Sequence, residues 1–220
     1  GVYDGIYFTN VDRSLITSDS LSANGDVGVY FNLSDTNSVQ NNNVSLNTSD
    51  GIIAFSSSAD TFNGNTLMSN GGSGIVLFTS SANTVTGNTA NSNAVYGVSL
   101  TSTSNNNTIS NNTANSNASG GFPVSGSSNN TLTGNTANSN TFEGFTFSST
   151  ANDNVLTGNT ANSNTRYGVL VQASAVRNRI ARNIFRSNQE AGVTILNADT
   201  ATLELNDIAL SDSGVRIEGS

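Results

Sequence analysis

The 220-residue sequence predicts an all-β fold: a right-handed parallel β-helix of about nine coils, each with 22–24 residues and three short strands. Three observations predict it. A glycine followed by alternating apolar residues recurs at a nearly constant spacing, and both the apolar residues and the asparagines fall at the same places in successive repeats. We expect a single β-helix domain over residues 1–220, without recognisable caps.

Each repeat begins at a glycine followed by two alternating apolar residues, as in Gly74-Ile-Val-Leu. Successive glycines are 22 to 24 residues apart, so nine full repeats and the start of a tenth fill the chain. Such a period indicates a solenoid, and coils of this length favour the right-handed form. The repeats start at Gly5, Gly28, Gly51, Gly74, Gly97, Gly121, Gly144, Gly168, Gly192 and Gly214.

Three short strands are predicted in each repeat, and residues 74–96 illustrate them. Ile75 and Leu77 alternate with an outward residue, which is the period of a half-buried strand. Val85 lies between two threonines and centres a second strand, and Ala90 is the inward residue of a third. The apolar fraction of 35% suffices for a core because it is concentrated in these four columns, where each large side chain contributes roughly 1.5–3 kcal/mol.

Asparagine also recurs in columns, and it accounts for 37 of the residues. Its amide both donates and accepts hydrogen bonds, so it can join the coils on either side, and it tolerates left-handed backbone. We therefore expect structural asparagine ladders with left-handed backbone at these corners. One ladder contains Asn42, Asn65, Asn88, Asn112, Asn135, Asn159, Asn183 and Asn206, and the second contains Asn47, Asn70, Asn93, Asn117, Asn140, Asn164 and Asn188. A third, less complete column has Asp60 among its asparagines.

The composition excludes several kinds of function. The chain lacks Cys, His and Lys, which rules out disulfides, thiolate or histidine metal sites and Ser-His-Asp triads. A net charge of −8 argues against nucleic acid as a partner. No apolar run approaches the length of a membrane span. We expect no cofactor and no metal.

The units Asn83-Thr-Val-Thr-Gly-Asn-Thr-Ala-Asn-Ser-Asn and Asn130-Thr-Leu-Thr-Gly-Asn-Thr-Ala-Asn-Ser-Asn resemble the right-handed β-helix repeats of NosD-like proteins. Similar repeats are typical of carbohydrate-binding and sugar-hydrolysing β-helices and of microbial surface proteins. The resemblance covers essentially the whole chain and is more specific for fold than for function. The copper role of NosD-like proteins does not carry over, because the chain has no His or Cys and only Met68.

Charged residues of both signs are dense only in the last three coils. Paired carboxylates can cleave glycosidic bonds, and arginine can position an acidic sugar. A solvated, partly ion-paired surface explains the same residues. The possible ligand-binding residues are Arg179, Arg182, Arg186, Glu204 and Asp207.

The main functional expectation is a non-catalytic extracellular structural module at the cell surface. Such a module could act as an adhesin or form a filament by head-to-tail self-association. The chain begins and stops inside the repeat pattern, so the remainder of a longer chain is the other expected partner. The alternative is a polysaccharide-binding or polysaccharide-cleaving β-helix. Ice binding through outward threonine rows is a further alternative. Asn106 and Asn129 are possible glycosylation sites.

Overall fold

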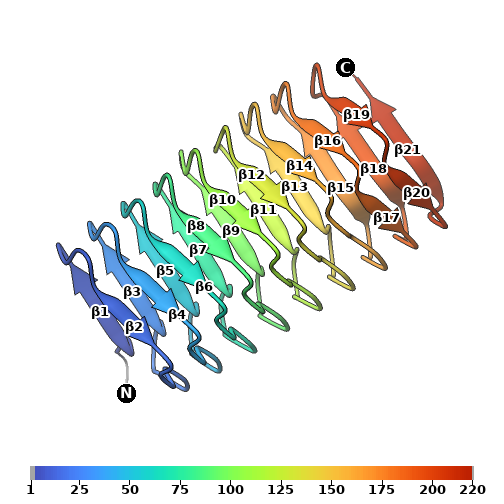
Figure 1. The fold of residues 1–220 in the computed structure, drawn as a ribbon. Helices are drawn as coiled ribbons and strands as arrows, with labels where there is room; N and C mark the ends of the chain where they lie inside the picture. The colour runs from blue at the N-terminus through green and yellow to red at the C-terminus, as the bar shows by residue number, and fades with distance from the viewer. Residues whose placement is uncertain (1–2, 220) are drawn as a thin grey trace.

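A computed structural model describes residues 3–219, and these residues form a regular parallel β-helix (Figure 1). The chain winds from the N-terminal coil to the C-terminal coil without an excursion, and each coil adds one strand to each of two long sheets. Every strand pair is parallel. The all-β solenoid of about nine coils predicted from the repeat is confirmed. The described residues contain no helix of a length and apolarity that could cross a membrane.

The ten-stranded sheet is built from the segment that follows each repeat glycine. Its strands run in coil order, so each strand pairs with the equivalent strand of the next coil. They are β1 (Ile6–Thr9), β3 (Val29–Asn32), β5 (Ile52–Phe55), β7 (Ile75–Phe78), β9 (Val98–Thr101), β11 (Phe122–Ser125), β13 (Phe145–Ser148), β15 (Tyr167–Gln172), β18 (Ala191–Leu196) and β21 (Ser213–Glu218).

The nine-stranded sheet forms a second face of the solenoid. Its strands have three residues each, with the central side chain pointing into the core. They are β2 (Leu15–Thr17), β4 (Ser38–Gln40), β6 (Thr61–Asn63), β8 (Thr84–Thr86), β10 (Thr108–Ser110), β12 (Thr131–Thr133), β14 (Val155–Thr157), β16 (Arg179–Ala181) and β19 (Thr202–Glu204).

In most coils the segment that forms the third face is too short to count as a strand. From Ser20 to Ile184, successive coils are joined there by isolated one-residue bridges, such as Thr89 to Thr113. Only β17 (Ile184–Arg186) and β20 (Asp207–Ala209) reach strand length and pair with each other. This face lies between the two asparagine ladders, whose members are five positions apart in each coil, as Asn88 and Asn93 are.

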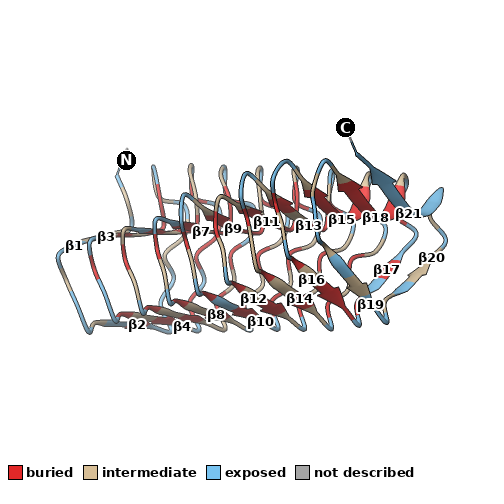
Figure 2. Ribbon diagram, turned by 90° about the horizontal axis from the view of Figure 1, so that it is seen from above, coloured by how far each residue is buried: buried red, intermediate tan, exposed pale blue. Residues whose placement is uncertain are grey.

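The core is a continuous apolar interior enclosed by the three faces (Figure 2). Strand alternation sends Ile75 and Leu77 inward, where both are fully buried, and Val85 and Ala90 meet them from the other faces. The repeat glycine lies where chain and core come closest. A Cβ on Gly97 would lie 2.3 Å from the Cβ of Ala114 and 2.9 Å from the carbonyl oxygen of Gly121.

Asparagine side chains form continuous hydrogen-bonded rows at the corners. Asn112 is typical: its Oδ1 accepts from the backbone N–H and Nδ2 of Asn88, both at 2.9 Å. Its Nδ2 donates to Oδ1 of Asn135 at 3.0 Å and to the carbonyl oxygen of Val85 at 2.9 Å. Asn140 repeats the pattern in the second ladder. Each amide therefore joins neighbouring coils while it is fully buried.

The expectation of left-handed backbone at the ladder asparagines is wrong by one residue. Positive φ occurs at the residue before each of them, as at Asn111 (54°) and Ser116 (57°), and at Gly87 (63°). The preceding residue makes the bend, so its side chain points away from the core. The asparagine that follows can then direct its amide into the corner.

Candidate functional site

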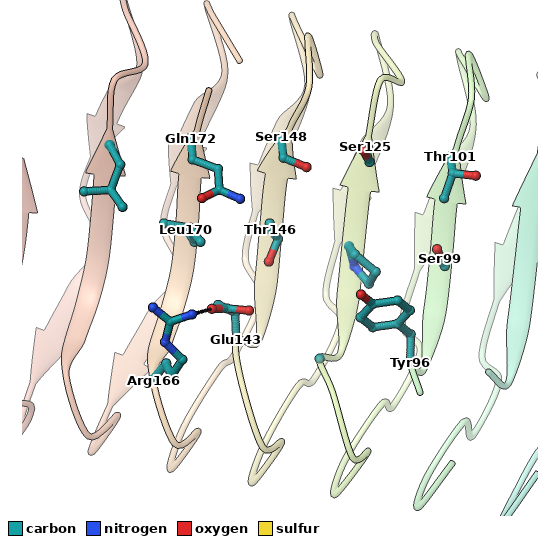
Figure 3. Close-up of a pocket in the computed structure, with 13 residues that line it drawn as sticks. Tyr96, Ser99, Thr101, Ser125, Glu143, Thr146, Ser148, Arg166, Leu170 and Gln172 are labelled. Atoms are coloured by element: carbon teal, nitrogen blue, oxygen red, sulfur yellow. Dashed lines mark hydrogen bonds and ion pairs between the residues drawn. The ribbon is translucent and has the colours of Figure 1, made fainter. Parts of the chain in front are cut away.

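An open groove of about 330 Å³ crosses the outward face of the ten-stranded sheet between β9 and β18 (Figure 3). It runs across several coils, because its lining comes from equivalent positions of successive strands. The lining residues are Tyr96, Ser99, Thr101, Gly120, Pro123, Ser125, Glu143, Thr146, Ser148, Arg166, Leu170, Gln172 and Leu196.

Small side chains form the floor of the groove. Val98 and Leu100 point into the core, so Ser99 and Thr101 face outward, and the same alternation places Ser125 on β11. Leu170 and Gln172 on β15 are larger and narrow the groove toward β18 (Figure 3). The hollow therefore results from a run of short outward residues followed by long ones.

One long edge of the groove is formed by the residues that immediately precede the repeat glycines. Tyr96, Gly120 and Glu143 occupy this position in three successive coils. Tyr96 and Glu143 lie at the same edge in Figure 3, opposite Thr101 and Ser148. Gly120 has no side chain, so the edge is open between the phenol ring and the carboxyl group.

Arg166 is held between two glutamates at this edge. Its Nη1 lies 3.1 Å from Oε1 of Glu143 in the preceding coil, and its Nε lies 3.2 Å from Oε1 of Glu190 in the following coil. Its Nη2 also donates to the Tyr167 hydroxyl at 3.2 Å, and its guanidinium carbon is 4.8 Å from the centre of that ring. The cluster carries two negative charges and one positive charge when both glutamates are ionised.

The two glutamates are in different environments. The Glu143 side chain is only 13% exposed. Burial raises the pKa of Glu143, and the charge of Arg166 opposes the rise only in part. The hydrogen bond from the Tyr167 hydroxyl, followed by those from Arg166, lowers the pKa of Glu190. A pair of carboxyl groups with pKa values pushed in opposite directions can act as an acid and a base.

The groove offers hydroxyl groups, a carboxamide, an aromatic ring and a charged cluster, which are suited to a ligand rich in hydroxyl groups. Among residues 3–219, no group of three or more His, Cys, Asp or Glu side chains comes together as a metal site would require.

The charged residues singled out from the sequence lie outside the groove and on different faces. Arg179 on β16 pairs with Glu204 on β19 at 2.6 Å, on the nine-stranded sheet. Arg186 on β17 pairs with Asp207 on β20, on the two-stranded sheet. Arg182 is an exposed corner residue with positive φ. The structure thus forms two separate exposed ion pairs from these residues.

The asparagines named from the sequence also lie away from the groove. Both ladders are almost entirely buried at the corners, where they join coils. Asn106 and Asn129 are exposed and have positive φ, and each directly precedes a buried asparagine of the third column.

Sequence reasoning missed Glu143, Arg166 and Tyr96 because they occupy corner positions where the repeat varies. One signal was available: Glu143 is the only charged residue between Asp60 and Asp153. A lone carboxylate in so long an uncharged stretch is unusual. Its partner Arg166 could not be identified without the geometry, because the two are 23 positions apart and occupy different places in their repeats.

Solved structures with a similar fold come from polysaccharide-modifying enzymes. The A-module of the Azotobacter vinelandii mannuronan C-5 epimerase AlgE4 has a TM-score of 0.75 at 19% identity, and the match covers 85% of this chain and 57% of that one. An alginate lyase from Paenibacillus sp. str. FPU-7 has a TM-score of 0.67 at 14% identity, covering 97% of this chain and 88% of the lyase. This chain therefore spans little more than half of the first of these structures.

A third similar structure is the catalytic domain of a GH87 alpha-1,3-glucanase in complex with tetrasaccharides, with a TM-score of 0.62 at 15% identity over 92% of this chain and 56% of that one. No curated protein matches this sequence. At these identities the likeness establishes the fold. The comparisons nevertheless contradict the main expectation, a non-catalytic structural module that forms filaments, and favour the polysaccharide alternative.

The family is established by a direct match to the sequence. The model of the right handed beta helix region matches residues 2–114 and 101–208, which together include most of the chain. This match agrees with the parallel pairing and the coil order of the structure. The chain belongs to the right-handed β-helix family.

Proposed function

We propose that this β-helix binds a polysaccharide in the groove of the ten-stranded sheet. The main observation behind this proposal is the open groove across successive coils, which has Tyr96, Glu143 and Arg166 along one edge. An elongated ligand suits it, because neighbouring coils present equivalent groups about 4.8 Å apart. The names of the similar structures, alginate epimerases, an alginate lyase and a glucanase, support this class of ligand.

The chemistry of the lining also supports a polysaccharide. Sugar hydroxyl groups both donate and accept hydrogen bonds, and Thr101, Ser125 and Gln172 can do the same. The Tyr96 ring offers an apolar face to the C–H groups of a pyranose. An extracellular or cell-surface location is part of the proposal, and the name of one similar structure, a periplasmic alginate epimerase, supports a place outside the cytoplasm.

Binding is tested by isothermal titration with a panel of soluble polysaccharides. We expect saturable binding by the wild type and at least about tenfold weaker binding by Tyr96→Ala and Arg166→Ala. Arg179→Ala is the matched control, because it also removes a half-exposed, ion-paired arginine but lies on the nine-stranded sheet. Equal losses in Arg166→Ala and Arg179→Ala would refute the groove as the site.

A second function, cleavage of the bound polymer, is favoured by one observation: Arg166 holds Glu143 and Glu190 on either side of it, at 3.1 and 3.2 Å, with their pKa values shifted in opposite directions. In this reading the neutral form of Glu143 donates a proton to the glycosidic oxygen as the bond from that oxygen to the anomeric carbon breaks. Water adds to the anomeric carbon, and the ionised Glu190 takes up its proton. The assay is release of reducing ends by the wild type, Glu143→Gln and the control Glu204→Gln. We expect loss of activity in Glu143→Gln alone, and wild-type activity in that variant would refute the role.

A further inference from the structure

The outward face of the ten-stranded sheet carries exposed aromatic pairs between its N-terminal end and the groove. Tyr7 and Tyr30 are stacked with ring centres 5.2 Å apart and planes 14° apart. Phe55 and Phe78 are stacked with centres 5.2 Å apart and planes 8° apart. We call these four residues the aromatic strip. Tyr7, Phe55 and Phe78 are 53%, 37% and 38% exposed, so they are not part of the core.

The aromatic strip and the groove belong to one surface. The register pairs Phe78 on β7 with Thr101 on β9, and Val76 with Ser99. Thr101 and Ser99 line the groove, so the columns that contain the aromatic rings continue directly into its floor. A polymer that lies lengthwise in the groove would therefore reach Phe78 and then Phe55 in the coils toward the N-terminus.

The fold itself does not require these rings. The same outward columns contain Thr101 and Ser125 in other coils, with the same strand geometry. Aromatic side chains that are grouped and exposed on one face are typical of an interaction surface. The stacked pairs place a partly exposed ring in each of two neighbouring coils, and these apolar rings can contact the C–H groups of successive sugar units.

The surface is also uncharged. From β1 to β18, the outward positions of the ten-stranded sheet hold no Asp, Glu, Lys or Arg, although the chain has a net charge of −8. The first charges are Arg216 and Glu218 on β21, which pair with each other. Arg166, the one basic residue in the groove lining described here, is already bonded to Glu143 and Glu190. No cation of this face is left to neutralise a row of carboxylates on a ligand.

We infer that the ligand is a neutral polysaccharide and that it continues from the groove onto the aromatic strip. The inference rests on the proposed function and adds the charge class of the polymer and a second contact surface. A polyuronate is disfavoured, because its carboxylates would meet an edge that carries Asp4, Asp50 and the Glu143–Arg166–Glu190 cluster, and this cluster is negative or neutral but never positive. This differs from the alginate named for several similar structures.

The test uses a double variant, Phe55→Ser/Phe78→Thr, whose new side chains already occur in the same column at Ser125 and Thr101. Thermal unfolding verifies that it folds as the wild type does. The probes are soluble glucans and mannans, tetrasaccharides prepared from them, and alginate and polygalacturonate. Isothermal titration measures each affinity.

We expect the wild type to bind a neutral polymer and not the polyuronates. The double variant should bind that polymer about tenfold more weakly than the wild type does. It should bind the tetrasaccharide with wild-type affinity, because the groove alone can hold a ligand of that length. Equal affinity of both proteins for the polymer, or preference of the wild type for a polyuronate, would overturn this inference while leaving groove binding intact. A wild type that binds no glycan would overturn the proposed function as well. Self-association of the wild type that is lost in the double variant would overturn the inference by showing that a second copy of the chain occupies the aromatic strip.

Discussion

Asp60 is a carboxylate in a row of asparagines, and replacing it with asparagine should stabilise the protein at neutral and alkaline pH. It is 1% exposed and lies between Asn37 and Asn83. Its Oδ1 accepts from the backbone N–H of Asn37 at 2.7 Å, but its Oδ2 has no partner. The equivalent Nδ2 of Asn83 donates to the carbonyl oxygen of Ser57 at 3.2 Å. A carboxylate cannot donate such a bond, whereas a protonated carboxyl group or an amide can.

The size of the stability change follows from how tightly the Asp60 carboxyl group binds a proton in the folded protein. Burial raises the pKa of Asp60 from 3.8 to about 7; hydrogen bonds from Asn37 oppose the rise, and the charges of Asp35 and Asp12 add to it. The folded protein therefore binds a proton more tightly than the unfolded chain, and its stability falls as pH rises from about 4 to about 7. At about 1.4 kcal/mol for each tenfold change in affinity, the loss has an upper bound of about 4 kcal/mol.

The assay is the thermal midpoint of unfolding, followed by circular dichroism, for the wild type and Asp60→Asn between pH 4 and pH 8. We expect Asp60→Asn to be more stable at pH 8 by roughly 5–10 °C and to differ little near pH 4. Asp26→Asn is the control, because it removes the same charge from an exposed corner. An Asp60→Asn midpoint at pH 8 equal to or below that of the wild type would refute the reasoning.

Three further predictions concern the ladders, the repeat glycines and the charged cluster. Asn112→Ala removes four buried hydrogen bonds and should cost at least about 3 kcal/mol in urea unfolding. Asp153→Ala, at an exposed ion pair with positive φ, should cost far less, and similar midpoints for both variants would contradict the ladder's role. Gly97→Ala should destabilise the protein far more than Gly158→Ala, because a Cβ at position 97 would lie 2.3 Å from the Cβ of Ala114. A Cβ at position 158 meets nothing within 4 Å, so only the positive φ costs about 1–2 kcal/mol there; the reverse order in calorimetry would contradict the packing described. Arg166→Ala should destabilise more at pH 8 than at pH 4, since it leaves the buried Glu143 carboxylate unpaired, and a pH-independent loss would disprove that coupling.

The core and the ladders were predictable because the repeat places equivalent residues directly above one another. A column such as Ile52, Ile75 and Val98 is apolar in every coil, so its burial follows from the period alone. The corner geometry was less accessible. Left-handed backbone falls on residues as varied as Leu46, Ser69 and Arg182, and their identities give no hint of it.

The groove could not be predicted for a related reason. It depends on which outward residues are short and on how Tyr96, Glu143 and Arg166 turn at one edge, and neither follows from the period. Charge density in the sequence instead drew attention to Arg179, Arg186, Glu204 and Asp207, which the fold separates onto two other faces. The aromatic strip was visible as Tyr7, Tyr30, Phe55 and Phe78 in outward columns, but its continuity with the groove required the register.

Hydroxyl-radical footprinting with and without a bound neutral glucan tests most directly whether the ten-stranded sheet is the binding surface. The account predicts that the ligand protects Tyr96 and Leu196 in the groove and Phe55 and Phe78 on the aromatic strip, while Leu15 and Leu46 elsewhere stay as reactive as in the free protein. Protection of Leu15 and Leu46 with unchanged reactivity at Tyr96 and Phe78 would contradict it.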